Sequence, residues 1–127
     1  MIKQIRQAAF FCVGGGTYVA LELLYRGRSH ISMFAAGGVC FLLLGKLEKK
    51  SLSSAAKAGL GTLTITAVEL ITGLLFNRDY SVWDYREQPL HFMGQICPAF
   101  MLLWLPLSLV AMGLYSRLDR LWAVGAD

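Results

Sequence analysis

Four long apolar blocks dominate this sequence and constrain its fold more than any other feature. They cover residues 8–25, 31–47, 55–76 and 95–115. A helix needs about 20 predominantly apolar residues to cross the hydrocarbon core of a bilayer. A chain in lipid must also pair its own backbone groups, which favours helices. We therefore predict an all-α polytopic membrane protein, with four transmembrane helices forming one domain over residues 1–127.

The composition excludes two other classes of protein. Hydrophobic residues make up 56% of the chain and charged residues 16%, whereas soluble domains average about 45–50% and 25%. A soluble domain this short could not bury so much apolar surface, and a disordered chain would be more polar. Cys12, Cys40 and Cys97 lie in apolar stretches without zinc-site spacing, so we expect no metal or other cofactor.

The charged residues are few and fall between the apolar blocks, where they indicate orientation. We interpret the formal net charge of +4 as a topology signal rather than a sign of nucleic-acid binding, because basic residues are enriched on the cytoplasmic side of membranes. Eight Lys and Arg residues lie on the side of both termini and four on the other. This bias predicts cytoplasmic termini and an outer loop over residues 77–94. The basic N-terminus resembles a signal peptide but lacks a cleavage site, so we expect a retained first helix.

A weak internal repeat relates the two halves of the chain. In each half a glutamate precedes an outer arginine and then a histidine that opens the return helix. The residues are Glu22, Arg26 and His30, then Glu69, Arg78 and His91. Two helices per half would make a parallel 2+2 helical repeat, although the unequal spacings leave coincidence as the alternative.

The third apolar block carries a continuous face of small and polar residues. Steps of three and four residues place Ala55, Gly59, Thr62, Thr66, Glu69 and Gly73 on one side of a helix. Small residues let another helix approach closely, and threonines can hydrogen-bond across such a seam. The face is therefore either a tight helix–helix seam or a polar path centred on Glu69.

Two glutamates lie inside the predicted spans, and their surroundings differ. Arg26 follows Glu22 at i+4, so we expect a local ion pair near the outer interface. No basic residue lies one turn from Glu69, and an acidic group at that depth costs roughly 2.5 kcal/mol or more. We therefore expect Glu69 to be protonated, paired or in a hydrated cavity, and we favour a functional role for it.

The predicted outer loop concentrates polar and aromatic side chains. Trp83, Asp84, Tyr85 and His91 lie within nine residues, and Gln95 follows. Acid–base chemistry by Asp84 and His91 is conceivable, but no GxSxG or HExxH pattern accompanies them. A solvated loop with an interfacial aromatic belt is the alternative interpretation.

Several motifs together resemble a known family. They are ELLYRG at 22–27, SHISMF at 29–34, ELITG at 69–73, VWDY at 82–85, Pro89, GQIC at 94–97 and Trp104. The pattern, which covers most of the chain, is similar to the putative ABC-transporter type IV membrane family. One departure is His91, where that family often has Asn.

The resemblance implies a bacterial multispanning membrane protein of the cytoplasmic membrane, with a permease-like role. Since the chain has no ATPase motif, ATP coupling would need a separate subunit. Four helices are few for a transporter protomer, so a permease role also implies oligomerisation or a membrane partner.

Three hypotheses about function follow, and each predicts different surroundings for Glu69. A transporter predicts a hydrated Glu69, with Thr62, Thr66 and Glu22 along a polar path. A non-catalytic scaffold or regulatory subunit predicts Glu69 buried with both oxygens hydrogen-bonded. A lipid-acting enzyme, which we do not favour, predicts that Glu69, Asp84 and His91 converge at the outer interface.

Overall fold

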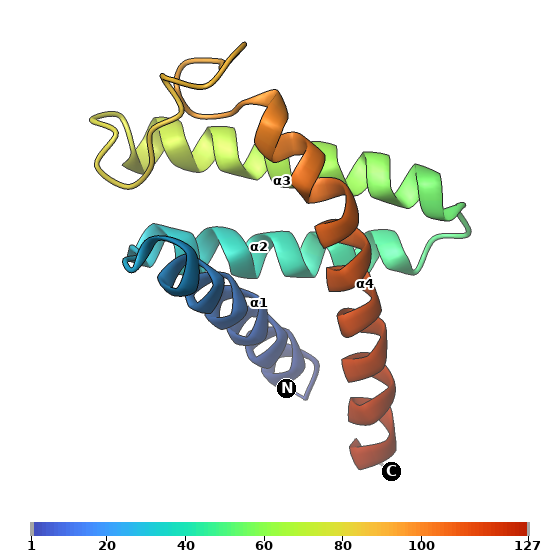
Figure 1. The fold of residues 1–127 in the computed structure, drawn as a ribbon. Coiled ribbons are helices and arrows are strands. Elements are labelled where there is room, and N and C mark those ends of the chain that lie inside the picture. Colours follow the sequence, from blue (N-terminus) through green and yellow to red (C-terminus); the bar gives the residue numbers. More distant parts are fainter. Residues whose placement is uncertain (1, 127) are drawn as a thin grey trace.

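The computed structural model describes the backbone of residues 2–126 and the side chains of residues 2–123. It contains four helices, α1 (Ile2–Arg26), α2 (Ile31–Glu48), α3 (Ser54–Phe76) and α4 (Pro98–Ala126) (Figure 1). Each is long and apolar enough to cross a membrane, and the described residues form no strand beyond an isolated bridge between Phe92 and Ile96. The prediction of an all-α protein with four membrane-length helices is confirmed.

Capping residues explain where the helices begin and end. Gly27 ends α1 with φ of +73°, a conformation that costs glycine little. His30 caps α2, where its Nδ1 accepts from the Ser32 backbone N–H at 3.1 Å. Ser53 caps α3 in the same way, its Oγ accepting from the Ala56 N–H at 3.1 Å.

The fourth helix differs from its expected range of 95–115. It begins at Pro98, whose fixed φ and missing N–H suit the first turn of a helix. It then continues to Ala126, beyond the apolar block. Side chains of the extension contact α1, where Arg6 forms an ion pair with Asp119 and the Phe10 ring meets Trp122 edge-on at 6.1 Å. Long-range contacts therefore lengthen this helix.

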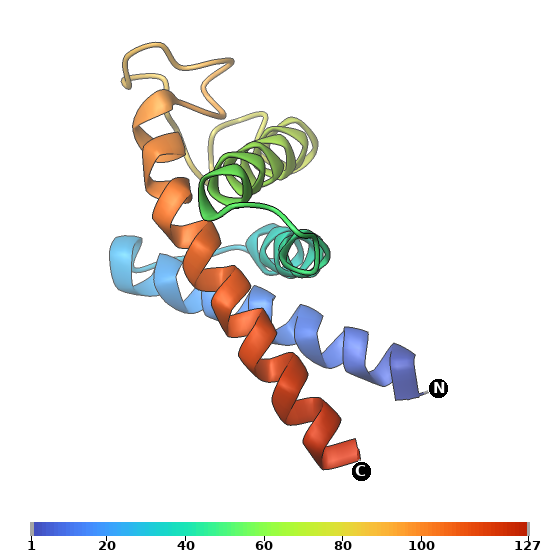
Figure 2. The same ribbon diagram turned by 90° about the vertical axis from the view of Figure 1, so that its right-hand side faces the viewer.

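The helices are arranged as an antiparallel pair crossed by two others. Helices α2 and α3 lie side by side, α4 crosses both of them obliquely, and α1 crosses α2 on the side away from α3 (Figures 1 and 2). The most extensive contacts join α1 to α2, and those joining α3 to α4 come next. This pairing is compatible with two helical hairpins, and the 2+2 sequence repeat stays a prediction.

Glycines make the close approach of α1 and α2 possible. A Cβ atom added at Gly14 would lie 2.8 Å from the Gly37 carbonyl oxygen, and one at Gly37 would lie 2.9 Å from the Gly14 carbonyl oxygen. These backbones therefore meet without intervening side chains, as small residues allow between membrane helices.

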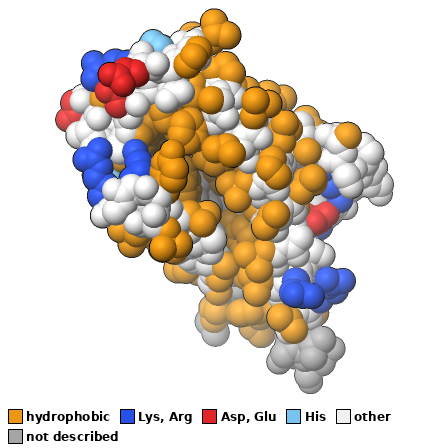
Figure 3. Space-filling view, in the orientation of Figure 1, with side chains coloured by type: hydrophobic (Ala, Val, Ile, Leu, Met, Phe, Trp, Pro, Cys, Tyr) orange, Lys and Arg blue, Asp and Glu red, His pale blue; other side chains and the backbone are white. Residues whose placement is uncertain are grey.

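Apolar side chains form a broad band from the top to the bottom of the visible surface, and charged groups gather near its edges (Figure 3). Large exposed side chains include Leu24 and Leu63, which are 86% and 60% exposed. In water such a surface would be costly, whereas in a bilayer it faces hydrocarbon. The chain is therefore a multi-pass membrane protein.

Candidate functional site

The candidate site is centred on the buried face of α3. Thr62, Thr66, Glu69 and Gly73 are buried there, and Glu69 is only 6% exposed. The predicted face is not buried along its whole length, because Ala55 is exposed and a Cβ at Gly59 would meet nothing within 4 Å. Its buried part runs from Thr62 toward the loop after α3.

The Glu69 carboxylate has one hydrogen-bonded oxygen and one without a partner. Its Oε2 accepts from the Tyr85 hydroxyl at 3.0 Å, whereas Oε1 is buried without a hydrogen-bond partner among the described residues. A buried acceptor left unpaired costs free energy. The site therefore has unused capacity to bind a donor.

Neither Thr62 nor Thr66 hydrogen-bonds to another helix within the described part of the chain. Thr62 Oγ1 donates to the Ala58 carbonyl of its own helix at 2.8 Å. Thr66 Oγ1 is buried without a hydrogen-bond partner among residues whose side chains the structure describes. Thr66 lies one turn before Glu69, so two unpaired oxygens, Thr66 Oγ1 and Glu69 Oε1, belong to the same helix face.

Glu22 and Arg26 form the expected ion pair within α1. Arg26 Nε donates to Glu22 Oε2 at 2.6 Å, and both side chains are largely shielded from solvent. The pair lies near enough to act electrostatically on Glu69. The structure thus brings Glu22 and Arg26 into the surroundings of Glu69 without a direct bond.

Tyr85 connects the loop to this site. Its ring stacks on Phe100 of α4, with centroids 4.6 Å apart and planes 15° apart. Burial raises the pKa of the Tyr85 phenol, and the Glu69 charge raises it further. The hydroxyl therefore keeps its proton and acts as the donor in the bond to Glu69.

A buried amide pair holds the loop in place. Asn77, which caps α3 and is fully buried, donates from Nδ2 to the Trp83 carbonyl at 2.6 Å and to Gln95 Oε1 at 2.8 Å. Gln95 Nε2 donates to the Asn77 carbonyl at 3.0 Å. Trp83 Nε1 donates to the Gln95 carbonyl at 2.9 Å. These bonds fix the start and the end of the loop against each other.

Asp84 and His91 lie on the outside of the loop. Asp84 accepts two hydrogen bonds from the Arg86 guanidinium, at 2.9 Å and 2.8 Å, and one from the Arg86 backbone N–H at 2.9 Å. His91 Nδ1 accepts from the Gly94 N–H at 2.9 Å. Both side chains are exposed, whereas Glu69 is buried. The structure therefore does not bring together the three residues that an enzyme at this interface would use.

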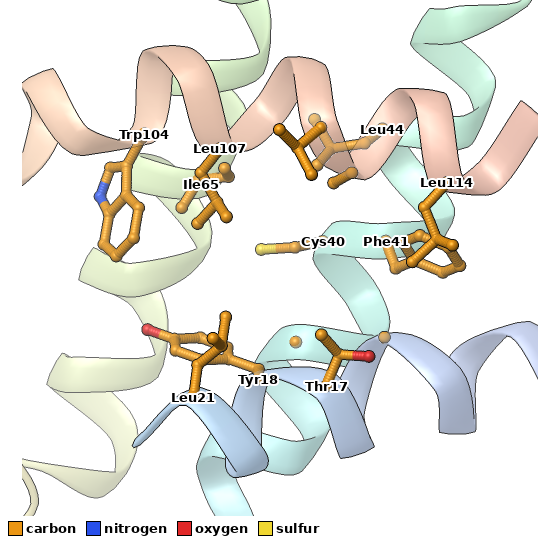
Figure 4. Close-up of a pocket in the computed structure, with 14 residues that line it drawn as sticks. Thr17, Tyr18, Leu21, Cys40, Phe41, Leu44, Ile65, Trp104, Leu107 and Leu114 are labelled. Carbon is orange, nitrogen blue, oxygen red and sulfur yellow. The ribbon is translucent and has the colours of Figure 1, made fainter. Parts of the chain in front are cut away.

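Two cavities adjoin the site. A larger one of about 120 Å³ lies between α1, α2 and α4 (Figure 4). A smaller one of about 10 Å³ lies against Glu69, Thr72 and Trp83. Tyr18, Cys40 and Ile65 line both. The described residues include no group of three His, Cys, Asp or Glu side chains that could hold a metal ion.

Sequence reasoning did not place three residues in this site, although Trp104 was among the motifs of the family resemblance. Asn77 follows the third apolar block, where a helix-capping amide could have been expected. Tyr18 and Trp104 come from α1 and α4, and no local pattern distinguishes them. Trp104 lies beside the Glu69 carboxylate, and its Nε1 is buried without a hydrogen-bond partner among the described residues.

Comparison with protein families gives a match to residues 11–122, and the matching family is described as "Putative ABC-transporter type IV". Comparisons with curated proteins and with solved structures found no match.

Proposed function

Since the chain belongs to the putative ABC-transporter type IV family, we propose that it is a permease-like component of a transporter with a polar intramembrane site at Glu69. The observation that carries the proposal is the unpaired Oε1 of Glu69 in a side chain that is only 6% exposed. Ionisable residues inside a membrane are rare and typically serve binding or proton transfer. Thr66, with its own unpaired hydroxyl, extends the site by one turn toward Thr62.

The loop forms the outer closure of this path. The Tyr85 hydroxyl donates a hydrogen bond to Glu69. The hydrogen bonds between Asn77 and Gln95 hold the loop against the end of α3. Release of the Tyr85 bond would expose the carboxylate to the outer side. Glu22 and Arg26, paired at the end of α1, would then line the mouth of the path.

We place the protein in the bacterial cytoplasmic membrane with both termini in the cytoplasm. The bias of Lys and Arg toward the ends of the chain and the loop between α2 and α3 supports this orientation. ATP-driven transport would require a separate ATPase subunit. A second copy of the chain or another membrane subunit would supply further helices.

The test measures whether water reaches the Glu69 face. Cys12, Cys40 and Cys97 are first replaced by Ala, and Thr66→Cys is introduced. Intact cells are treated with a small charged methanethiosulfonate added from outside. We expect the new thiol to react, because a polar path admits the reagent.

The control is Ala67→Cys, the next residue of α3, which is exposed on the apolar surface. A charged reagent does not enter hydrocarbon, so this thiol should stay unmodified. If Thr66→Cys is as unreactive as Ala67→Cys, the proposal of a polar path along this face is wrong.

A second candidate, a non-catalytic scaffold, is favoured by one observation. The Tyr85 bond satisfies one oxygen of Glu69 and anchors the loop, as a purely structural carboxylate would. An unreactive Thr66→Cys variant, together with intact assembly of Glu69→Gln, would favour this second function.

A further inference from the structure

The larger cavity is apolar, and its opening lies between α1 and α4. Its walls are almost entirely carbon, and Figure 4 shows side chains of α4 on one side and α1 on the other. Three lining residues at its rim are exposed, Leu21 (44%), Val110 (67%) and Leu114 (38%). Since α1 and α4 are membrane-length helices, this opening faces the bilayer hydrocarbon.

The size of the cavity fits a hydrocarbon group. It measures about 120 Å³, and apolar cavities of about 150 Å³ stay dry and bind benzene. Water would find almost no hydrogen-bond partner there. A segment of alkyl chain from the surrounding bilayer is therefore the occupant that the walls favour.

One layer of side chains separates this cavity from Glu69. Tyr18, Cys40 and Ile65 line both the apolar cavity and the small cavity against Glu69. In Figure 4 the Tyr18 hydroxyl and the Trp104 nitrogen both point toward α3. The wall is thus apolar on the cavity side and carries polar atoms on the Glu69 side.

The polar atoms behind this wall match one kind of head group. Glu69 Oε1 is an unpaired acceptor and Trp104 Nε1 an unpaired donor beside the same carboxylate. A hydroxyl group both donates and accepts, so it can satisfy both atoms. An ammonium group cannot accept from Trp104, and a carboxylate would be repelled by Glu69.

From these observations we infer that the site binds a membrane-dissolved alcohol with an alkyl chain, which occupies the cavity while its hydroxyl bonds Glu69 and Trp104. This inference rests on the proposed function, because it names the ligand class of the Glu69 site. Tyr18 must turn aside for the hydroxyl to pass.

The experiment uses the full chain in lipid nanodiscs and a long-chain primary alcohol that carries a diazirine. Photolabelled residues are mapped by peptide mass spectrometry. We expect labelling of the cavity walls on α1 and α4. The matching carboxylic acid should label the same walls more weakly.

Two variants at the rim test the location. Val110→Trp fills the opening and should abolish the labelling, as should Thr17→Trp on α1. The matched control is Leu102→Trp, at a position of α4 that is also 67% exposed but does not line the cavity. Equal labelling of all three variants, or labelling spread over the whole lipid-facing surface, would overturn the site.

A third variant tests the head group. Trp104→Phe removes the N–H but keeps an aromatic ring, and should weaken alcohol labelling roughly threefold to tenfold, as expected for one hydrogen bond. Labelling by a headless diazirine alkane should not change. An unchanged alcohol signal, or equal labelling by alcohol and acid, would overturn the hydroxyl assignment.

The outcomes separate this inference from the proposed function. If no alcohol binds but Thr66→Cys reacts with the aqueous reagent, the ligand class is wrong and the polar path stands. If the alcohol binds and Thr66→Cys is inert, the cavity is a lipid site without a polar path.

Discussion

The hydroxyl of Tyr85 donates a hydrogen bond to Oε2 of Glu69 at 3.0 Å. This bond joins a loop residue to a buried carboxylate of α3. Among the described residues, Tyr85 is the side chain that donates a hydrogen bond to the Glu69 carboxylate. The other carboxylate oxygen, Oε1, has no hydrogen-bond partner among them. Loop position and the state of the candidate site are therefore linked through one pair of side chains.

The variant Tyr85→Phe should destabilise the protein. It keeps the ring that stacks on Phe100 but leaves Glu69 without a donor, which costs about 1–3 kcal/mol for a buried acceptor. The measurement is the thermal unfolding midpoint in detergent. Tyr80→Phe is the control, since its hydroxyl bonds the Met93 carbonyl within the exposed loop. Equal midpoints for both variants would show that the Tyr85 bond is not stabilising.

The variants Glu69→Gln and Glu69→Ala should behave differently. The amide oxygen of Gln can accept from Tyr85, whereas Ala removes the acceptor. We expect the loop to stay protected from proteolysis in Glu69→Gln and to be cleaved faster in Glu69→Ala. Equal protection of the loop from proteolysis in the two variants would show that the Glu69 side chain does not anchor the loop.

Gly73 should tolerate no side chain. A Cβ there would lie 2.8 Å from Cδ of Gln95. The Gln95 side chain cannot move freely, because its amide oxygen and its amide nitrogen are both hydrogen-bonded to Asn77. Gly73→Ala should cost about 1–3 kcal/mol, as overpacking does. The same change at Gly59, where nothing lies within 4 Å, should be neutral or stabilising by up to about 1 kcal/mol. Unfolding midpoints of the two variants in detergent provide the comparison.

The sequence predicted the helices because apolar length is a local property. It also predicted that Thr62, Thr66, Glu69 and Gly73 share one side of α3, since small and polar residues repeat at helical spacing, and left open whether that side is a seam or a polar path. Gly59 and Ala55 continue that pattern, yet they are not buried. A neighbouring helix, rather than the pattern, decides how far along α3 the burial extends.

The rest of the site depends on contacts between distant residues. Tyr85 reaches Glu69, and Asn77 reaches Gln95, only because the loop folds back over α3. Trp104 comes to the same carboxylate from α4. No spacing rule relates residues on separate elements, so sequence reasoning named Tyr85 and Gln95 without their partners.

The glycines of α1 should differ in their tolerance of alanine. A Cβ at Gly14 would lie 2.8 Å from the Gly37 carbonyl oxygen, whereas a Cβ at Gly16 would meet nothing within 4 Å. Gly14→Ala should therefore push α1 from α2 and lower the unfolding midpoint, and Gly16→Ala should not. A disulfide-forming cysteine pair across the seam would report the separation directly. Wild-type stability of Gly14→Ala would contradict the close approach.

Asp84 should remain ionised well into the acidic range. Hydrogen bonds from Arg86 lower its pKa to about 2. A carboxylate whose pKa is lowered on folding contributes its stabilisation above the unfolded value of about 3.9. That contribution is lost as the pH falls through the folded pKa. Carboxyl-carbon NMR across an acid titration in micelles measures this value. Arg86→Gln should raise it toward the unfolded value, whereas Arg78→Gln, whose native guanidinium bonds the Leu74 carbonyl instead, should leave it unchanged. An Asp84 pKa near 3.9 in the unaltered protein would mean that the Arg86 pair does not form in solution.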